Sequence, residues 1–261
     1  MEKRSMASTA KWRGRVAKAL FECKLRGQKA VFALIDPDKP VNLEGVRLQA
    51  LRSATAVFIG GSSGVIPYDV DEVIRKLRTS GVTSPIIIFP GGLNNIGAEA
   101  DAILYMSLLN TNDVYWAVGA QVLAAPIVAK LGLEPLPSAY IIVGEGGAAG
   151  HVGRVQPIPR DKPELVAAYV LAARFMGKRF VYLEAGSGAK TPVPLEVISA
   201  ARRAAGDDVY LIVGGGIRDP ETALSVLNSG ADAIVLGTII ETNPARAKEI
   251  IDRVSPCKLS I

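Results

Sequence analysis

Eight short apolar runs, rich in Val, Ile, Leu and Ala, constrain the fold more than any other feature of the chain. Within each run hydrophobicity is continuous rather than alternating, which is typical of parallel strands covered on both faces. Amphipathic stretches with helical spacing lie between most of the runs. This alternation predicts an α/β protein, and it favours a closed (β/α)8 barrel over an open doubly wound sheet. The runs are Val31–Asp36, Ala56–Gly60, Pro85–Phe89, Ala102–Leu108, Ala139–Val143, Phe180–Glu184, Val209–Val213 and Ala233–Leu236.

The chain length of 261 residues matches the roughly 250 residues of one such barrel, the TIM barrel, so we expect a single domain over residues 1–261. An extra helix is predicted before the first strand, from about Thr9 to Cys23. The segment between Phe89 and Ala102 is short and rich in Gly and Pro, so the third helix should be short or missing. The resulting gap would either admit a long apolar ligand beside the barrel mouth or be a shortening without a role.

Composition argues against several other classes of protein. The formal net charge is +5, with Lys and Arg scattered, which disfavours nucleic-acid binding. Cys23 and Cys257 lie near opposite ends with no metal-type spacing, so we expect reduced thiols and a cytoplasmic setting. No apolar run approaches the ~18 residues of a membrane span, and no signal peptide is recognisable, so a soluble protein is expected.

Glycines follow the last two predicted strands. Val209–Val213 runs into Gly214-Gly215-Gly216, and Ala233–Leu236 runs into Gly237-Thr238. Glycines at neighbouring strand ends let backbone N–H groups approach an anion closely, because no Cβ intervenes. This is the layout of the phosphate site between strands 7 and 8 of a (β/α)8 barrel. The pattern predicts an enzyme that handles a phosphorylated substrate.

Oxygen-bearing side chains end three other strands. Asp36 would point into the barrel mouth and suits Mg²⁺, although Asp-Pro-Asp is also common turn chemistry. Ser62 follows the second strand and offers a hydroxyl to the neighbouring position, or simply belongs to a loop. Glu184 ends an apolar strand, where an unpaired carboxylate is costly, so a functional role is favoured.

Some familiar motifs are excluded by spacing. The segment Gly186–Thr191 lacks the P-loop spacing, and no acidic residue follows Gly144–Ala149 at the distance that a dinucleotide site requires. His151 is the only histidine and is expected to be exposed in a glycine-rich loop. Acid–base chemistry would therefore fall to carboxylates, Tyr or Lys.

Five strand-end motifs occur in order along most of the chain: Leu34–Lys39, Ile59–Ser62, Tyr182–Gly188, Val213–Arg218 and Leu236–Thr238. Together they resemble the geranylgeranylglyceryl phosphate synthase family, which includes the bacterial heptaprenylglyceryl phosphate synthases. The run Tyr-Leu-Glu-Ala-Gly-Ser-Gly at 182–188 is the most distinctive of them.

The resemblance implies a Mg²⁺-dependent prenyltransferase on a modified TIM barrel. It would join geranylgeranyl diphosphate to the 3-hydroxyl of sn-glycerol 1-phosphate, forming the first ether bond of archaeal membrane lipids. Asp36 and Ser62 would be the metal ligands. Glu184, with Tyr182, would be catalytic, Glu184 either accepting the hydroxyl proton or orienting the hydroxyl. The residues implied to bind glycerol phosphate are Tyr182, Leu183, Glu184, Ala185, Gly186, Ser187, Gly188, Gly215, Gly216, Gly237 and Thr238.

The chain departs from the bacterial pattern in one place. Bacterial members carry a lysine two residues before the metal aspartate, where this chain has Leu34, and Ala185-Gly186-Ser187 is similar to the archaeal version. The prenyl tail is expected in an apolar groove over the strand tips, with Tyr105 and the helix of Trp116 as candidate walls.

Two other functions remain open at the level of the residues. One is a different phosphate-binding barrel enzyme, such as a sugar-phosphate isomerase, although a second acid–base residue opposite the first is not evident. The other is a non-catalytic phosphate-binding barrel, against which Asp36, Glu184 and the glycines argue. Apolar residues around Trp116–Leu133 exceed what one helix face buries, which predicts a homo-oligomer. Prenyl chain length, dimer versus hexamer, and transient contact with a membrane surface stay open.

Overall fold

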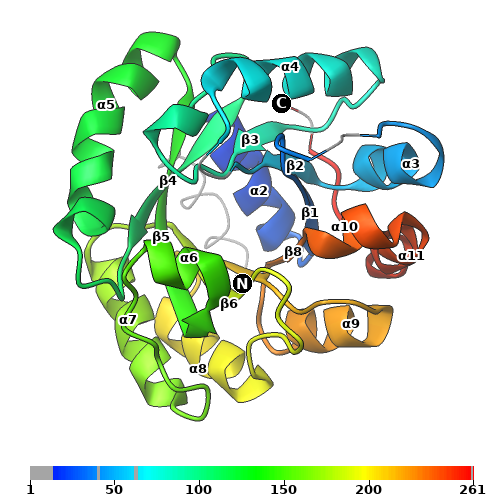
Figure 1. The fold of residues 1–261 in the computed structure, drawn as a ribbon. Helices are drawn as coiled ribbons and strands as arrows, with labels where there is room; N and C mark the ends of the chain where they lie inside the picture. Colours follow the sequence, from blue (N-terminus) through cyan, green and yellow to red (C-terminus); the bar gives the residue numbers. More distant parts are fainter. Residues whose placement is uncertain (1–13, 40–41, 62–63, 260) are drawn as a thin grey trace.

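The computed structural model describes residues 14–39, 42–61, 64–259 and 261. Eight parallel strands close into a barrel in chain order, with β1 paired to β8, as Figure 1 shows. The predicted (β/α)8 barrel is therefore confirmed. The strands are β1 (Ala30–Ile35), β2 (Ala56–Ile59), β3 (Ile86–Ile88), β4 (Ala102–Leu108), β5 (Glu134–Gly146), β6 (Phe180–Gly186), β7 (Tyr210–Gly214) and β8 (Ala233–Leu236).

Most of the helices form a ring outside the barrel, whereas α2 lies across one of its ends (Figure 1). None of them, within the described residues, is long and apolar enough to cross a membrane. They are α2 (Arg15–Leu25), α3 (Gly45–Ser53), α4 (Pro67–Thr79), α5 (Ala120–Leu131), α6 (Gly147–Val152), α7 (Pro163–Phe175), α8 (Leu195–Ala205), α9 (Pro220–Asn228), α10 (Thr238–Thr242) and α11 (Pro244–Val254). A 3₁₀ turn, η1 (Leu93–Asn95), and a π-helical turn, η2 (Tyr115–Gly119), complete the set.

The hydrophobic core has two layers, because successive side chains of a strand point to opposite faces. In β6, Phe180 and Tyr182 belong to the layer inside the barrel. Val181, Leu183 and Ala185 belong to the layer between the barrel and the helices. Both faces of each strand are thus covered, which explains the continuous apolar runs in the sequence.

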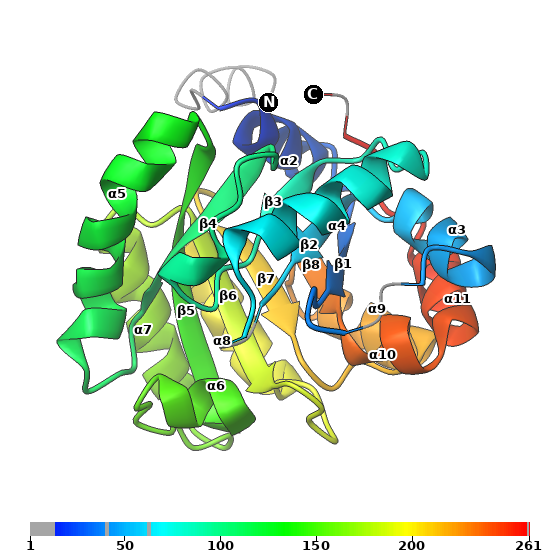
Figure 2. The ribbon, with the colours of Figure 1, turned by 45° about the horizontal axis from the view of Figure 1, so that its top comes forward.

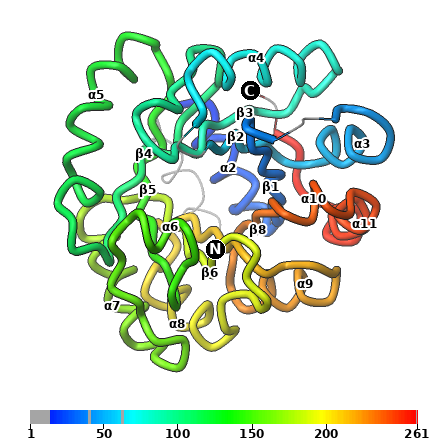
Figure 3. The backbone as a smooth tube through the Cα atoms, viewed as in Figure 1, coloured from blue at the N-terminus to red at the C-terminus, as the bar shows by residue number. Residues whose placement is uncertain are grey.

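The third unit of the barrel has no full helix. Only η1 lies between β3 and β4, and in Figure 3 the outer helices on either side of this segment are α4 and α5. The prediction of a short third helix is confirmed. The loops after β2 and β3 press together here, since a Cβ at Gly91 would lie 2.1 Å from the carbonyl oxygen of Gly61. A glycine is therefore required at position 91.

Strand β5 begins five residues earlier than the sequence pattern indicates, at Glu134 rather than Ala139. Pro135 and Pro137 argue against a strand, yet both pair with β4. The neighbouring strand β6 pairs with β5 only from Ser138 onward, so the prolines lie on a stretch with one open edge. Proline is tolerated there because its missing N–H has no partner strand to serve.

Helix α2 covers the amino-terminal ends of the strands, as Figure 2 shows. Of the helix predicted from Thr9 to Cys23, the first residues lie outside the described part, and the helix continues beyond Cys23 to Leu25. Phe21 packs against the rings of Phe180 and Tyr210 in the barrel interior. The α2 helix therefore closes the end of the barrel opposite the strand tips.

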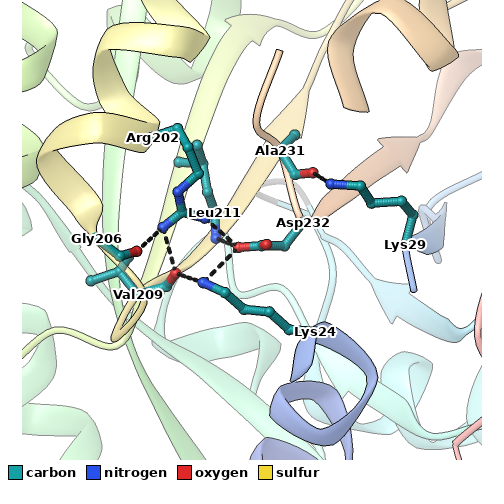
Figure 4. Close-up of polar contacts among 8 residues, drawn as sticks. All are labelled: Lys24, Lys29, Arg202, Gly206, Val209, Leu211, Ala231 and Asp232. Atoms are coloured by element: carbon teal, nitrogen blue, oxygen red, sulfur yellow. Dashed lines mark hydrogen bonds and ion pairs between the residues drawn. The ribbon is translucent and has the colours of Figure 1, made fainter. Parts of the chain in front are cut away.

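A buried polar network attaches α2 to the barrel floor (Figure 4). Lys24 donates to the carbonyl oxygen of Val209 at 2.6 Å and lies 3.3 Å from Asp232. Asp232 also pairs with Arg202 at 2.7 Å and accepts from the backbone N–H of Leu211. Burial lowers the pKa of the Lys24 ammonium, and the charge of Asp232 opposes that effect. One carboxylate thus ties the helix to the strands β7 and β8.

The two cysteines are not free thiols, and the expectation of reduced thiols is wrong for this structure. Cys23 and Cys257 form a disulfide with Cα atoms 6.2 Å apart and a sequence separation of 234 residues. The chain returns to the barrel floor after α11, where Cys257 donates its backbone N–H to Lys29. The pairing depends on this return and leaves no local signal in the sequence.

Candidate active site

One large cavity opens at the carboxyl ends of the strands. Its volume is about 1300 Å³, and its walls come from loops after most of the strands together with η2 and α5. One side carries Tyr182, Glu184 and the glycines after β7, and the other carries Asp36 and Lys39 after β1. The cavity lies where the active sites of (β/α)8 barrels are found.

Glu184 is the buried carboxylate of the cavity, with 7% of the residue exposed. The backbone N–H of Gly186 donates to its Oε1 at 2.6 Å, and Tyr182 and Tyr140 donate from their hydroxyls. Burial raises the pKa of the Glu184 carboxyl, and the hydrogen bonds from Gly186, Tyr182 and Tyr140 oppose part of that rise. A carboxylate held in this way is a fixed and strengthened base.

The two tyrosines stand side by side on neighbouring strands. Tyr140 on β5 is in register with Tyr182 on β6, and their rings meet edge to face at 5.2 Å. The pKa of each hydroxyl is raised by burial first and then by the charge of Glu184. Both therefore stay protonated and act as donors, which fixes the orientation of the carboxylate.

The glycines after β7 are required by their neighbours. A Cβ at Gly214 would lie 2.0 Å from the Tyr182 hydroxyl oxygen, and one at Gly215 would lie 2.5 Å from Glu184 Oε1. Gly215 also has a φ of +84°, a conformation that favours glycine. The glycines leave space for the Tyr182–Glu184 pair and bring the backbone of this loop next to the carboxylate.

Asp36 lies across the mouth, half-buried at the end of β1. A Cβ at Gly60 would lie 3.2 Å from Asp36 Oδ1, so this oxygen faces the glycine loop after β2. Asp36 Oδ2 lies 3.5 Å from the ammonium of Lys39. Burial and then the charge of Asp38 raise the pKa of the Asp36 carboxyl, and Lys39 lowers it.

A hard cation fits this part of the mouth. Mg²⁺ is a hard cation that prefers oxygen ligands and often binds through only one or two carboxylates alongside substrate phosphates. The absent Cβ of Gly60 leaves Oδ1 of Asp36 open on one side. Ser62, the second predicted ligand, lies outside the described residues.

The far end of the cavity is apolar. Tyr105, Trp116, Ala120 and Ala124 line it, beside the short third unit. Tyr105 donates its hydroxyl to the carbonyl oxygen of Gln121, so its polar atom already has a partner within the protein. The predicted groove walls Tyr105 and Trp116 thus lie at the cavity.

The predicted glycerol phosphate residues divide into two groups. The cavity is not lined by Leu183, Ala185 or Gly186; the first two pack their side chains into the outer core layer, and Gly186 supports Glu184 through its N–H. The predicted binding and metal residues that line the cavity are Asp36, Tyr182, Glu184, Ser187, Gly188, Gly215, Gly216, Gly237 and Thr238.

His151 is exposed as expected, although it lies in α6 rather than in a loop.

Tyr140, Lys39 and Glu241 are among the cavity residues for which no role was predicted from the sequence. Tyr140 was inside a predicted strand, and strand alternation would have suggested its inward direction only once the register with β6 was known. Lys39 is 202 positions from Glu241, so their contact has no local signal.

The closed barrel, the buried Glu184 and the glycine loops at the strand ends define an enzyme of the TIM-barrel class with its site at the usual mouth. The chain belongs to the PcrB family, whose model matches residues 24–255.

Alignments with named relatives extend over nearly the whole chain. Geranylgeranylglyceryl phosphate synthase of Hyperthermus butylicus is 52% identical over 90% of this chain and 97% of its own length. The Aeropyrum pernix enzyme of that name is 44% identical over 92% of this chain and 96% of its own. A solved structure of the Thermoplasma acidophilum synthase, in complex with sn-glycerol-1-phosphate, has a TM-score of 0.84 and 33% identity, covering 94% of this chain and 99% of that one. The predicted prenyltransferase class is confirmed.

Proposed function

We propose that the chain joins geranylgeranyl diphosphate to the 3-hydroxyl of sn-glycerol 1-phosphate, which makes the first ether bond of archaeal membrane lipids. The observation that carries the proposal is Glu184, buried between Tyr140 and Tyr182 and facing the glycine loop after β7. Relatives named for this activity, 52% and 44% identical, support the choice of substrates. The alternatives of a sugar-phosphate isomerase and a silent barrel have no comparable support.

Glycerol phosphate would bind on the Glu184 side of the mouth. Gly215, Gly216, Gly237 and Thr238 offer backbone groups to its phosphate, and Ser187 and Gly188 close the same side. Arg218 lines the cavity and donates to the carbonyl oxygens of Gly188 and Ala189, so the loops after β6 and β7 hold one another. A phosphate fixed in this way brings the 3-hydroxyl toward Glu184.

The diphosphate would lie on the Asp36 side. Asp36 and Ser62 would hold Mg²⁺, which when bound supplies positive charge to the leaving diphosphate. The apolar end of the cavity, lined by Tyr105 and Trp116, takes the prenyl tail. The allylic C1 then lies between the two halves of the mouth.

In the chemical step one bond breaks, one bond forms, and Glu184 takes the proton that is released. The C1–O bond breaks and its electron pair leaves on the diphosphate, while the oxygen of the glycerol 3-hydroxyl forms the new bond to C1. Glu184 accepts the hydroxyl proton, and its raised pKa makes it a better acceptor than an ordinary carboxylate. Tyr140 and Tyr182 keep the carboxylate in place through their hydroxyl donors.

A chain-length series tests the function. The purified protein is given prenyl diphosphates of increasing length, each glycerol phosphate enantiomer, and Mg²⁺ or a chelator, and the products are identified by mass spectrometry. We expect Mg²⁺-dependent ether formation with the sn-glycerol 1-phosphate enantiomer. Equal turnover of both enantiomers, or isomerisation of a sugar phosphate instead, would contradict the proposal.

We also propose that the chain assembles with copies of itself through α5. Val114, Val118, Val122, Ile127 and Leu131 form an exposed stripe along η2 and α5 at nearly helical spacing. The stripe is made of branched aliphatic side chains, which suit the grooves of another helix, and Tyr115 and Lys130 stand beside its two ends.

Light scattering after gel filtration tests the assembly. Val118→Lys with Val122→Lys should lower the mass to that of one chain, whereas the exposed Leu195→Lys should not. Loss of vesicle binding in the same variants, with an unchanged mass, would indicate a membrane surface instead.

We also propose a cytoplasmic location, because glycerol phosphate is a water-soluble substrate. Cell fractionation tests this location.

A further inference from the structure

Lys39 forms a charged cluster with two carboxylates at the edge of the cavity. Its ammonium donates to Glu241 Oε2 at 2.8 Å and lies 3.5 Å from Asp36 Oδ2. All three side chains line the cavity, and Lys39 is about half exposed. The ammonium has three donors, so it retains capacity for a further acceptor from the open side.

The loops that carry the cluster are fixed by other contacts. The backbone N–H of Lys39 donates to the carbonyl oxygen of Asp36, which closes the turn after β1. Arg47 donates to the carbonyl oxygens of Ile240 and Glu241, which anchors α10. The backbone of Glu241 is therefore held in place. The ammonium of Lys39 lies closer to the carboxylate of Glu241 than to that of Asp36.

A purely structural tether accounts poorly for this arrangement. An ion pair between partly exposed side chains contributes little to stability, and Arg47 already joins α10 to α3. The ammonium instead stands beside the carboxylate expected to bind Mg²⁺, on the side away from Gly60.

We propose that Lys39 is the second cation of the diphosphate site: it shifts from Asp36 to the leaving diphosphate when Mg²⁺ binds, while Glu241 keeps it in position. The inference rests on the proposed function, since it requires a diphosphate at this end of the mouth. A diphosphate carries more negative charge than one divalent ion neutralises, and charge develops further on it as the C1–O bond breaks. An ammonium held near this point by Glu241 stabilises that charge through a charged hydrogen bond to the diphosphate.

Calorimetry with inorganic pyrophosphate tests this assignment without turnover. Lys39→Met should weaken binding of pyrophosphate in the presence of Mg²⁺ by about tenfold or more, as expected for loss of a charged hydrogen bond. Binding of Mg²⁺ alone should not weaken, because Asp36 loses a competing cation. Binding of sn-glycerol 1-phosphate should stay within about twofold, since its site lies on the Glu184 side.

Three further variants sharpen the result. Lys39→Arg should keep most of the pyrophosphate affinity, and Glu241→Gln should lose part of it because the ammonium is no longer held. Lys130→Met, which changes an exposed lysine outside the cavity, serves as the matched control.

If Lys39→Met binds pyrophosphate as the wild type does, the inference about Lys39 is overturned, while the proposed prenyl transfer is not affected. Equal weakening of glycerol phosphate would also overturn it and would show a structural tether. Wild-type protein that neither binds pyrophosphate nor turns over would overturn both proposals.

Discussion

At the scale of single residues, the site depends on one carboxylate and the groups around it. Glu184 is buried, yet it has a backbone donor and two tyrosine hydroxyls directed at it. An ionised carboxylate persists in such a place only with these partners. The same partners hold it at a fixed position beside the glycine loop of Gly214 and Gly215.

Glu184→Gln should lower kcat by about 10²–10⁴-fold, the usual contribution of a positioned acid–base group. Gln has a similar shape but cannot accept the hydroxyl proton, so the fold and the requirement for Mg²⁺ should be retained. Steady-state kinetics and circular dichroism check the two parts. A variant with unchanged kcat would remove Glu184 from the mechanism.

The same substitution should stabilise the protein at neutral pH. The folded-state pKa of Glu184 is raised, so folding favours the protonated form; its contribution is fully present below the unfolded pKa and is lost as pH rises through the folded value. Glu184→Gln is never charged and avoids that loss. The difference in melting temperature between variant and wild type should be positive at pH 7 and shrink as pH falls toward the ordinary value of 4.5.

At the scale of elements, the two ends of the barrel have different tasks. The carboxyl ends of the strands carry loops and the cavity, with the shortened third unit beside the apolar end. The amino ends are closed by α2, whose first backbone N–H groups, those of Val16 and Ala17, donate to Glu134. The sequence predicted both the extra helix and the short third unit, because each follows from local spacing and composition. It did not predict where α2 packs, since that depends on distant partners.

Asp232→Asn should destabilise the protein by about 3 kcal/mol, because it leaves the mostly buried charges of Lys24 and Arg202 without their carboxylate. Chemical denaturation measures the change. Asp252→Asn, which breaks an exposed pair with Lys248, should cost about 0–1 kcal/mol. Equal effects of the two substitutions would show that the network of Figure 4 does not hold α2 in place.

At the scale of the whole molecule, helix α2 and the segment after α11 meet at the barrel floor. The disulfide between Cys23 and Cys257 encloses nearly the entire chain, with a separation of 234 residues. A cross-link of this span removes much of the freedom of the unfolded state. It therefore acts on the stability of the barrel rather than on its site.

Cys23→Ser with Cys257→Ser should lower the free energy of unfolding by about 5 kcal/mol, the loop-entropy value for so long a span. Thermal melts with and without a reductant check this. The wild-type midpoint should fall in the reductant, and that of the double variant should not move. A wild-type midpoint that ignores the reductant would contradict the expected role of the disulfide.

The barrel, its irregular third unit, the glycine loops and the two carboxylates Asp36 and Glu184 could be predicted from the sequence. These features follow from local periodicity, from residues with special backbone freedom, and from motifs that end strands. Three contacts could be known only from the folded chain: those of Tyr140 with Glu184, of Lys39 with Glu241, and of Cys23 with Cys257. Pairing of β5 with β6, pairing of β1 with β8, and the return of the chain after α11 bring these residues within bonding distance.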